Sequence, residues 1–143
     1  MTELLFKKLS FDVVGAAMEV YNRLGPFFTE PTYQRAMEIE LRFRGIPFLA
    51  KQPVQIPYRD YVVASGEVDL LVDDSIIVEL KSASAIHPNH VSQTLTYLAA
   101  CERSLGLVLN FGNIDKLQIK RIPFSGSLEI LRSRRPEAAS GSS

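Results

Sequence analysis

The chain is poor in two informative residue types, because Cys101 is its only cysteine among 143 residues and it has no tryptophan. A single cysteine excludes an internal disulfide, a four-cysteine zinc site and a cysteine-ligated iron–sulfur cluster within one chain. Long hydrophobic runs are also absent. No segment approaches ~18 uninterrupted apolar residues, and the N-terminal MTELLFKKLS has no long apolar core. We therefore expect a cytoplasmic protein with no membrane partner.

An excess of charge of one sign is missing as well, since 16 Lys and Arg residues balance 16 Asp and Glu residues. Binding of nucleic acid by charge alone is typical of strongly basic domains, so such binding here needs a local basic patch. The length is sufficient for one hydrophobic core. We expect one domain over residues 1–131 and a flexible tail over 132–143, where RSRRPEAASGSS is polar and aperiodic.

Hydrophobic periodicity predicts three helices, at residues 10–24, 29–44 and 90–103. Ser10 and Thr29 are the candidate N-caps of the first two. Short runs rich in β-branched and aromatic residues, divided by prolines and Gly66, predict seven strands, five between residues 46 and 81 and two at 105–111 and 116–124. This order predicts an α/β fold of the layered α+β kind, in which helices flank a central mixed sheet with an antiparallel meander.

Charges lie at the outer ends of two apolar runs in EVDLLVDDSIIVELK, residues 67–81. Because strand side chains alternate between faces, each run has one apolar face and one face that becomes charged away from the turn. The apolar sets are Val68, Leu70 and Val72 on the first run and Ile76, Val78 and Leu80 on the second. The charged sets are Glu67 and Asp69 on the first run and Glu79 and Lys81 on the second.

The register of this hairpin decides which charges meet. A three-residue loop at residues 73–75 places Asp69 opposite Glu79, whereas a two-residue loop breaks this alignment. The same register places Glu67 opposite Lys81. Two carboxylates ~5 Å apart repel each other, and a divalent cation turns that repulsion into binding. Such oxygen ligands suit Mg²⁺ or Mn²⁺. An exposed sheet face with solvated charges and a Glu67–Lys81 pair explains the same pattern.

The motif formed by Asp69 with Glu79-Leu80-Lys81 resembles the core of the PD-(D/E)xK nuclease superfamily. Upstream, LGPFFTEPTYQRAMEIELRFRGI resembles the characteristic segment of the GxxExxY protein family, a RecB-like branch of that superfamily. Downstream, QTLTYL resembles the Gln-x-x-x-Tyr element of RecB-like nucleases, and LVLNFG and IKRI resemble closing strands of the GxxExxY family. The resemblance covers residues 10–124 and implies a restriction-endonuclease-like core.

Two positions depart from these patterns. With Glu30 and Tyr33 as the Glu and Tyr of the GxxExxY pattern, Phe27 stands where its glycine belongs, directly after Gly25-Pro26. Glycine adopts positive φ freely and phenylalanine only with strain, so we expect a different turn into the helix. The proline of the Pro-Asp dipeptide is replaced by Val68.

The resemblance implies a nuclease that uses Mg²⁺ or Mn²⁺ to hydrolyse phosphodiester bonds of nucleic acid, with DNA the expected substrate. The implied metal ligands are Asp69, Glu79, the Leu80 carbonyl and Glu30. Lys81 is implied to position or polarise the attacking water. Gln93, Tyr97 and Tyr33 are the implied pocket and substrate contacts. Without the resemblance, Gln93 and Tyr97 are an ordinary helix face and Glu30 is a first-turn carboxylate on the helix dipole.

Basic residues are candidates for contact with the phosphate backbone, although a solvated surface charge is the plainer interpretation of each. They are Lys51, Arg59, Lys116, Lys120 and Arg121. His87 and His90 form a His-x-x-His pair, for which zinc binding is one interpretation. Because neither a further cysteine nor an HExxH pattern accompanies the pair, we favour histidines at a helix start.

Two other functions stand beside the nuclease. One is a catalytically inactive nuclease fold that binds nucleic acid or another protein, which neutral net charge and Phe27 favour. The intact set of Asp69, Glu79 and Lys81 favours catalysis instead. The other is a purely structural subunit of a larger complex. For the oligomeric state, the sequence is compatible with a homodimer and with a larger complex.

Overall fold

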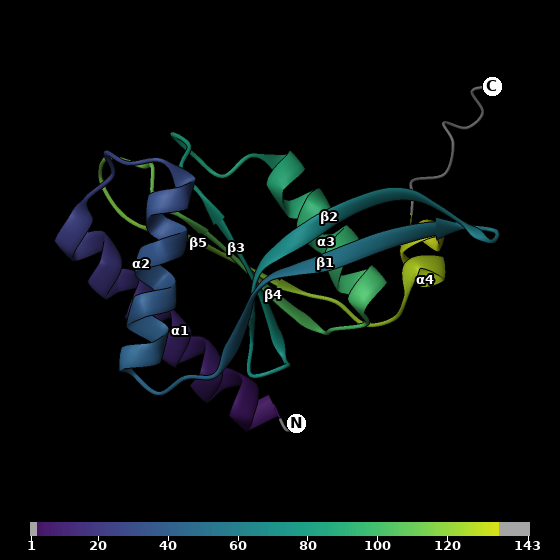
Figure 1. Ribbon diagram of the computed structural model, residues 1–143, viewed down its shortest axis with the longest axis horizontal. Coiled ribbons are helices and arrows are strands. Elements are labelled where there is room, and N and C mark those ends of the chain that lie inside the picture. The colour runs from purple at the N-terminus through teal and green to yellow at the C-terminus, as the bar shows by residue number, and fades with distance from the viewer. Residues whose placement is uncertain (1–2, 135–143) are drawn as a thin grey trace.

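The computed structural model describes residues 3–134. Its elements are α1 (Glu3–Leu24), α2 (Glu30–Phe43), β1 (Phe48–Tyr58), β2 (Tyr61–Val72), β3 (Ile76–Lys81), α3 (Pro88–Cys101), β4 (Leu105–Asn110), β5 (Gln118–Pro123) and α4 (Leu128–Ser133). The strands form one sheet in the order β1-β2-β3-β4-β5, in which β3 and β4 are parallel and all other neighbours are antiparallel (Figure 1). The predicted mixed sheet flanked by helices is confirmed.

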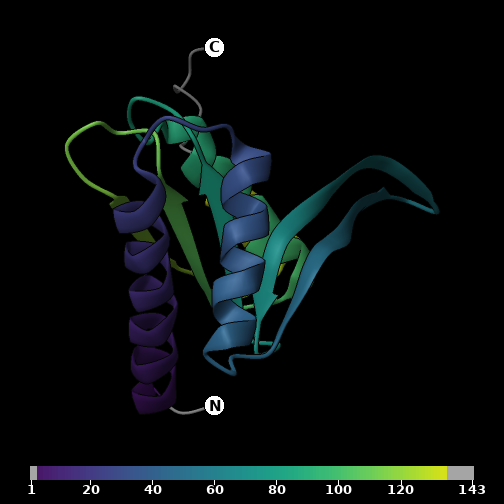
Figure 2. The ribbon, with the colours of Figure 1, turned by 60° about the vertical axis from the view of Figure 1, so that its left-hand side comes forward.

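Helices cover the two faces of the sheet in pairs, α1 and α2 on one face and α3 and α4 on the other (Figure 2). The central parallel strands are therefore shielded from solvent on both sides. All residues of β4 are buried, as are all residues of β3 except the half-buried Lys81. Continuous apolar runs such as SIIVEL and LGLVL are typical of strands covered in this way.

The first four short strands predicted between residues 46 and 81 are joined into two longer ones, β1 and β2, so that part of the prediction is wrong, whereas the fifth corresponds to β3. Pro53 and Pro57 do not interrupt β1, because β1 lies at the edge of the sheet, where the missing N–H of proline removes no necessary ladder bond. Gly66 lies inside β2 opposite Val54. A Cβ atom there would be 2.4 Å from the Tyr97 hydroxyl oxygen, so a side chain at this position would have to displace the Tyr97 side chain of α3.

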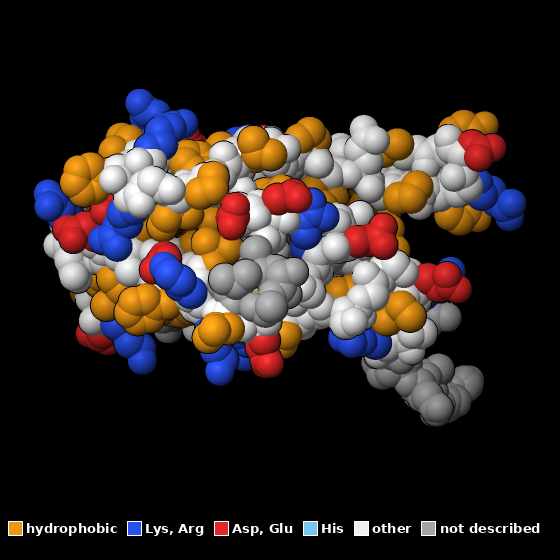
Figure 3. All heavy atoms as spheres, turned by 90° about the horizontal axis from the view of Figure 1, so that it is seen from below, with side chains coloured by type: hydrophobic (Ala, Val, Ile, Leu, Met, Phe, Trp, Pro, Cys, Tyr) orange, Lys and Arg blue, Asp and Glu red, His pale blue; other side chains and the backbone are white. Residues whose placement is uncertain are grey.

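Residues 53–66 of β1 and β2 form an arm that extends well beyond the body of the molecule (Figure 2). Exposed apolar side chains gather near its end, namely Tyr58, Tyr61, Val62 and Val63. In the space-filling view the arm stands apart from the body, and basic and acidic side chains are interspersed over the visible face (Figure 3). That mixture fits the neutral composition.

Both ends of the described chain differ from the prediction. The first helix begins at Glu3 and not at Ser10, since the strong helix formers of residues 3–9 extend it and Phe6 and Leu9 pack against the core. At the other end, α4 includes Arg132 and Ser133, which the sequence places in the tail. The rest of the predicted tail, residues 135–143, lies outside the described residues.

Candidate active site

The site lies where β2 and β3 part. The predicted register is confirmed, because Val72 pairs with Ile76, and the ladder continues to Leu70 and Val78. Asp69 and Glu79 are the next residue on each strand. At this point the hydrogen bonds between the two strands run from main-chain N–H groups to carboxylates. The Asp69 N–H donates to Glu79 Oε2 at 2.8 Å, and the Leu80 N–H donates to Asp69 Oδ2 at 2.8 Å. The two carboxylates, called here the acidic pair, are therefore held by each other's strands.

One face assignment is wrong. Leu70 and Val72 share one face as predicted, and that face packs toward α1 and α2, but Val68 packs toward α3 on the opposite face. The change of face falls at Asp69, opposite which Lys51 of β1 takes φ 54°. This irregular pair breaks the strict alternation of the hairpin, and alternation alone could not predict it.

Burial dominates the chemistry of the acidic pair. Glu79 is 2% exposed, and burial followed by the negative charge of Asp69 raises the pKa of Glu79 to about 8. A buried carboxyl beside a second carboxylate is a site short of positive charge. The donor set thus fits a divalent cation held by Asp69, Glu79 and the Leu80 carbonyl, because hard cations take oxygen ligands and remove this penalty.

Lys81 ends β3 beside the acidic pair. Its carbonyl accepts the Phe111 N–H at 2.8 Å, which holds the strand end in place. Its Nζ donates to Gln93 Oε1 of α3 at 3.4 Å. The predicted ion pair with Glu67 is wrong: β2 has left β3 at this level, and within residues 3–134 no salt bridge joins the two side chains. Lys81 therefore faces α3 rather than the β1–β2 arm.

The loop after Lys81 is held by Asn110, whose role sequence reasoning missed. The buried Asn110 side chain accepts the Ala83 N–H at 2.9 Å and donates to the Ala83 carbonyl at 2.8 Å. Gly112 makes this approach possible, since a Cβ there would lie 2.4 Å from the Ala83 carbonyl oxygen. A polar residue ending the apolar run LGLVLN was the available signal.

Helix α3 supplies the second wall of the site. Gln93 contacts Lys81 as described, and the Tyr97 hydroxyl lies against Gly66 of β2. Burial, followed by the charges of Glu79 and Asp69, raises the pKa of Tyr97 above its usual value. The structure thus brings both predicted α3 residues to the acidic pair.

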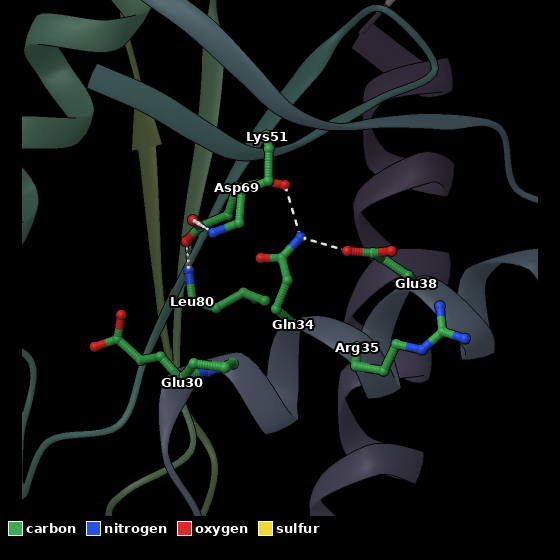
Figure 4. Close-up of a pocket in the computed structure, with 8 residues that line it drawn as sticks. Glu30, Gln34, Arg35, Glu38, Lys51, Asp69 and Leu80 are labelled. Carbon is green, nitrogen blue, oxygen red and sulfur yellow. Dashed lines mark hydrogen bonds and ion pairs between the residues drawn. The ribbon is translucent and has the colours of Figure 1, made fainter. Parts of the chain in front are cut away.

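Helix α2 supplies the opposite wall, where a pocket of about 290 Å³ opens onto Asp69. Its lining consists of Glu30, Pro31, Gln34, Arg35, Glu38, Lys51, Asp69 and Leu80. Glu30 is exposed, and its side chain extends away from Gln34 and Glu38 (Figure 4). Within residues 3–134 no three His, Cys, Asp or Glu side chains converge as a metal-binding group, so Glu30 does not join the acidic pair as the resemblance implies.

Gln34 is a site residue that sequence reasoning missed. It is only 7% exposed, and its Nε2 donates to the Asp69 carbonyl and to Glu38 Oε2, each at 2.9 Å (Figure 4). These two acceptors fix the orientation of the amide. Gln34 Oε1 is buried without a hydrogen-bond partner among the described residues. The signal was a polar residue one helical turn after Glu30, beside the apolar stripe.

Tyr33 is fully buried and stacks on Phe111, with ring centroids 4.5 Å apart. Its hydroxyl donates to the Gly25 carbonyl and accepts the Phe28 N–H. Tyr33 therefore supports the turn between α1 and α2, and the expectation that it contacts substrate is corrected. Gly25 takes the positive φ of this turn, 72°, while Phe27 does not, so phenylalanine at the glycine position of the GxxExxY pattern adopts no left-handed backbone.

The remaining basic candidates are scattered. Arg121 and Lys120 lie on β5, the edge strand separated from β3 by β4, so the structure does not bring Arg121 to the acidic pair. Arg59 stacks on Tyr58 at the end of the arm. Of the five basic candidates, Lys51 lies against the acidic pair, with Nζ 3.1 Å from Asp69 Oδ1.

His87 and His90 form the N-terminal cap of α3. His87 Nδ1 accepts the Asn89 N–H, and His90 Nδ1 accepts the His87 N–H, each at 3.0 Å. The helix-start interpretation is confirmed. Because these nitrogens serve the backbone, they are engaged as acceptors and do not form a zinc site.

Comparison with known proteins identifies the family. A family model for the PD-(D/E)XK nuclease superfamily matches residues 7–122, and the chain belongs to this superfamily. Its members generally use divalent metal ions and act on nucleic acid. The fold is similar to a crystal structure of the protein SSO0001, with a TM-score of 0.56 and 17% identity over 91% of this chain. The chain spans 62% of the length of that protein.

No curated protein matches the sequence. Within residues 3–134, no helix combines the length and the apolarity that crossing a membrane requires.

Proposed function

We propose that this protein is a nuclease of the GxxExxY, RecB-like branch that hydrolyses phosphodiester bonds of DNA with Mg²⁺ or Mn²⁺. The observation that carries the proposal is the acidic pair: Asp69 and the buried Glu79 lie together beside Lys81, at the point where two strands part. Superfamily membership supports the same chemistry.

The residues of the site have separable roles in this reaction. Asp69, Glu79 and the Leu80 carbonyl would hold the metal, which when bound would stabilise negative charge on the phosphoryl group and lower the pKa of a bound water. Lys81 is a donor beside the reacting centre and orients the attacking water. Gln93 positions the Lys81 ammonium through their hydrogen bond. Glu30, on the pocket rim, can reach water in the outer shell.

The test combines calorimetry with a cleavage assay on single- and double-stranded DNA and RNA. Wild type is expected to bind Mn²⁺ and to cut DNA, and Lys81→Ala is expected to bind Mn²⁺ yet cut at least about 100-fold more slowly. Lys8→Ala on exposed α1 is the matched lysine control. Equal cutting by Lys81→Ala, or no cutting of any polymer by wild type, contradicts the proposal.

A catalytically inactive module that binds nucleic acid or protein is the second candidate. The ion pair between Lys51 and Asp69 favours this inactive module, because the protein's own ammonium group already neutralises part of the charge of the acidic pair. The exposed apolar side chains on the arm also suit a binding surface. Binding of DNA without cleavage by wild type under all metal conditions would favour this function over the nuclease.

A further inference from the structure

The ammonium of Lys51 lies against the acidic pair from the edge of the sheet. Its Nζ is 3.1 Å from Asp69 Oδ1, while Asp69 Oδ2 accepts the main-chain N–H of Leu80 at 2.8 Å. Both oxygens of Asp69 are therefore engaged, one by a fixed backbone donor and the other by a long side chain. The Lys51 side chain is 51% exposed, so it can leave Asp69 without any rearrangement of the core.

The backbone directs Lys51 to this position. Lys51 lies inside β1 between the pairs Ala50–Leu70 and Gln52–Val68, which places it opposite Asp69. Its φ of 54° is in the left-handed region, which residues with a side chain adopt at an energetic cost. Such strained positions cluster at functional sites. The unusual backbone directly opposite Asp69 therefore supports a role for Lys51 at the site.

A divalent cation and the Lys51 ammonium compete for the same oxygen. Oδ2 already accepts the fixed Leu80 N–H, so Oδ1, which is held only by the side chain of Lys51, is the less constrained Asp69 oxygen for a cation. Two positive charges within ~4 Å repel each other, most strongly where solvent is partly excluded. The Asp69 side chain is 16% exposed, so this repulsion is only partly screened. Metal binding therefore favours release of Lys51.

We propose that Lys51 is a displaceable counter-ion, which holds Asp69 when no divalent cation is bound and contacts a phosphate of the nucleic acid after the cation has displaced it. This inference rests on the proposed function, because it requires both a cation at Asp69 and a nucleic-acid substrate. The pocket of about 290 Å³ that Lys51 and Asp69 share gives the released side chain room to move. Lys51 thereby couples metal binding to substrate binding.

The first test is the affinity for Mn²⁺ without nucleic acid, measured by calorimetry on the full chain. Lys51→Gln removes the competing charge, so we expect it to bind Mn²⁺ about three- to tenfold more tightly than wild type. Lys51→Arg keeps the charge and is expected to bind like wild type. Lys8→Gln is the matched control, since Lys8 forms a similar ion pair with Asp12 at 2.9 Å on exposed α1.

The second test is DNA binding with and without Mn²⁺, in a Lys81→Ala background that prevents cleavage. With Mn²⁺, Lys51→Gln is expected to weaken binding and to lower the slope of log affinity against log salt by about 0.9, as for one lost phosphate contact. Without Mn²⁺ the slope is expected to stay unchanged, because Lys51 is then bound to Asp69. Lys8→Gln is expected to change neither slope.

The outcomes separate this inference from the function on which it rests. If wild type binds no Mn²⁺, the proposed metal site and the inference fall together. If wild type binds Mn²⁺ but Lys51→Gln binds it equally or more weakly, Lys51 only orients Asp69, and the inference fails while the metal site stands. An unchanged salt slope with Mn²⁺ overturns the phosphate contact. Lys51→Met replaces Lys51→Gln if circular dichroism shows the latter to be unfolded.

Discussion

The hairpin of β2 and β3 carries two acidic residues at each end, and the two ends have different chemistry. At the turn, Asp73 and Asp74 take φ values of 50° and 53° in the loop between the strands. Asp74 is 81% exposed and forms an ion pair with Arg103 at 2.7 Å. At the other end, Asp69 and Glu79 lie in the interior, and the pKa of Glu79 is raised to about 8.

The difference shows that surroundings, rather than residue type, decide what a carboxylate does. The turn acids keep their hydration, and Asp tolerates the left-handed backbone that a tight loop requires. The acidic pair loses hydration because helices cover both faces of the sheet where the strands part. Its unfavourable charge is retained at a cost to stability, which is typical of functional sites.

The largest expected effect is on the pH dependence of stability. The pKa of Glu79 is about 8 in the folded protein against an ordinary 4.5, so the folded state binds the extra proton between these values. Stability therefore falls as pH rises from about 4.5 to about 8, by up to about 4 kcal/mol. Urea unfolding in a chelator, at pH 5 and pH 8.5, measures this loss.

The matched variants for that measurement are Glu79→Gln and Asp74→Asn. Glu79→Gln keeps an acceptor for the Asp69 N–H and has no proton to lose, so most of the pH dependence is expected to vanish. Asp74→Asn is expected to retain it in full. A wild-type curve that is flat over this range would mean that Glu79 is solvated like the turn acids.

Next in size is the contrast between Asp69→Asn and Asp73→Asn. Asp69→Asn removes a proposed metal ligand, so Mn²⁺ affinity and DNA cleavage are expected to fall about 100-fold or more. Asp73→Asn changes an exposed turn carboxylate, and both quantities are expected to stay within about twofold of wild type. Calorimetry and the cleavage assay provide the measurements. Similar losses in both variants would remove the distinction between the two ends.

The smallest expected effect is at the turn. Arg103 donates to the Asp74 carbonyl as well as to its carboxylate, so it ties the turn to the end of α3. Arg103→Ala is expected to cost about 1 kcal/mol, or about 2–4 °C in the thermal unfolding midpoint, since exposed ion pairs contribute little. Mn²⁺ affinity is expected to be unaffected. Loss of metal binding in this variant would show that the two ends are coupled.

Sequence reasoning succeeded where the evidence is local. The loop at residues 73–75 was sufficient to align the hairpin, because strand period and loop length together set the register. The helix starting at Glu30 and the capping histidines also follow from neighbouring residues. Pattern recognition then selected Asp69, Glu79 and Lys81 as a group, and the family match supports the nuclease class.

Sequence reasoning failed where the role of a residue depends on partners that are distant in the sequence. Tyr33 matches the GxxExxY pattern that the sequence resembles, yet its burial against Phe111 makes it a core residue. Gln34 escaped notice as part of the site, and Lys51 was a candidate for phosphate contact but not for an ion pair with Asp69, because their contacts with Asp69 span 35 and 18 residues. Val68 changed face because of an irregular pair between two strands, which no periodicity reveals.

The helices α1, α2 and α3, the hairpin register and the proximity of Asp69 to Glu79 could thus be inferred along the chain, because they depend on side-chain period, loop length and motif spacing. The burial that raises the pKa of Glu79, the loop clamp of Asn110 and the ion pair of Lys51 with Asp69 come from the folded sheet. These features arise when strands and helices distant in the chain pack together and exclude water, and the strength of electrostatic interactions depends on that exclusion.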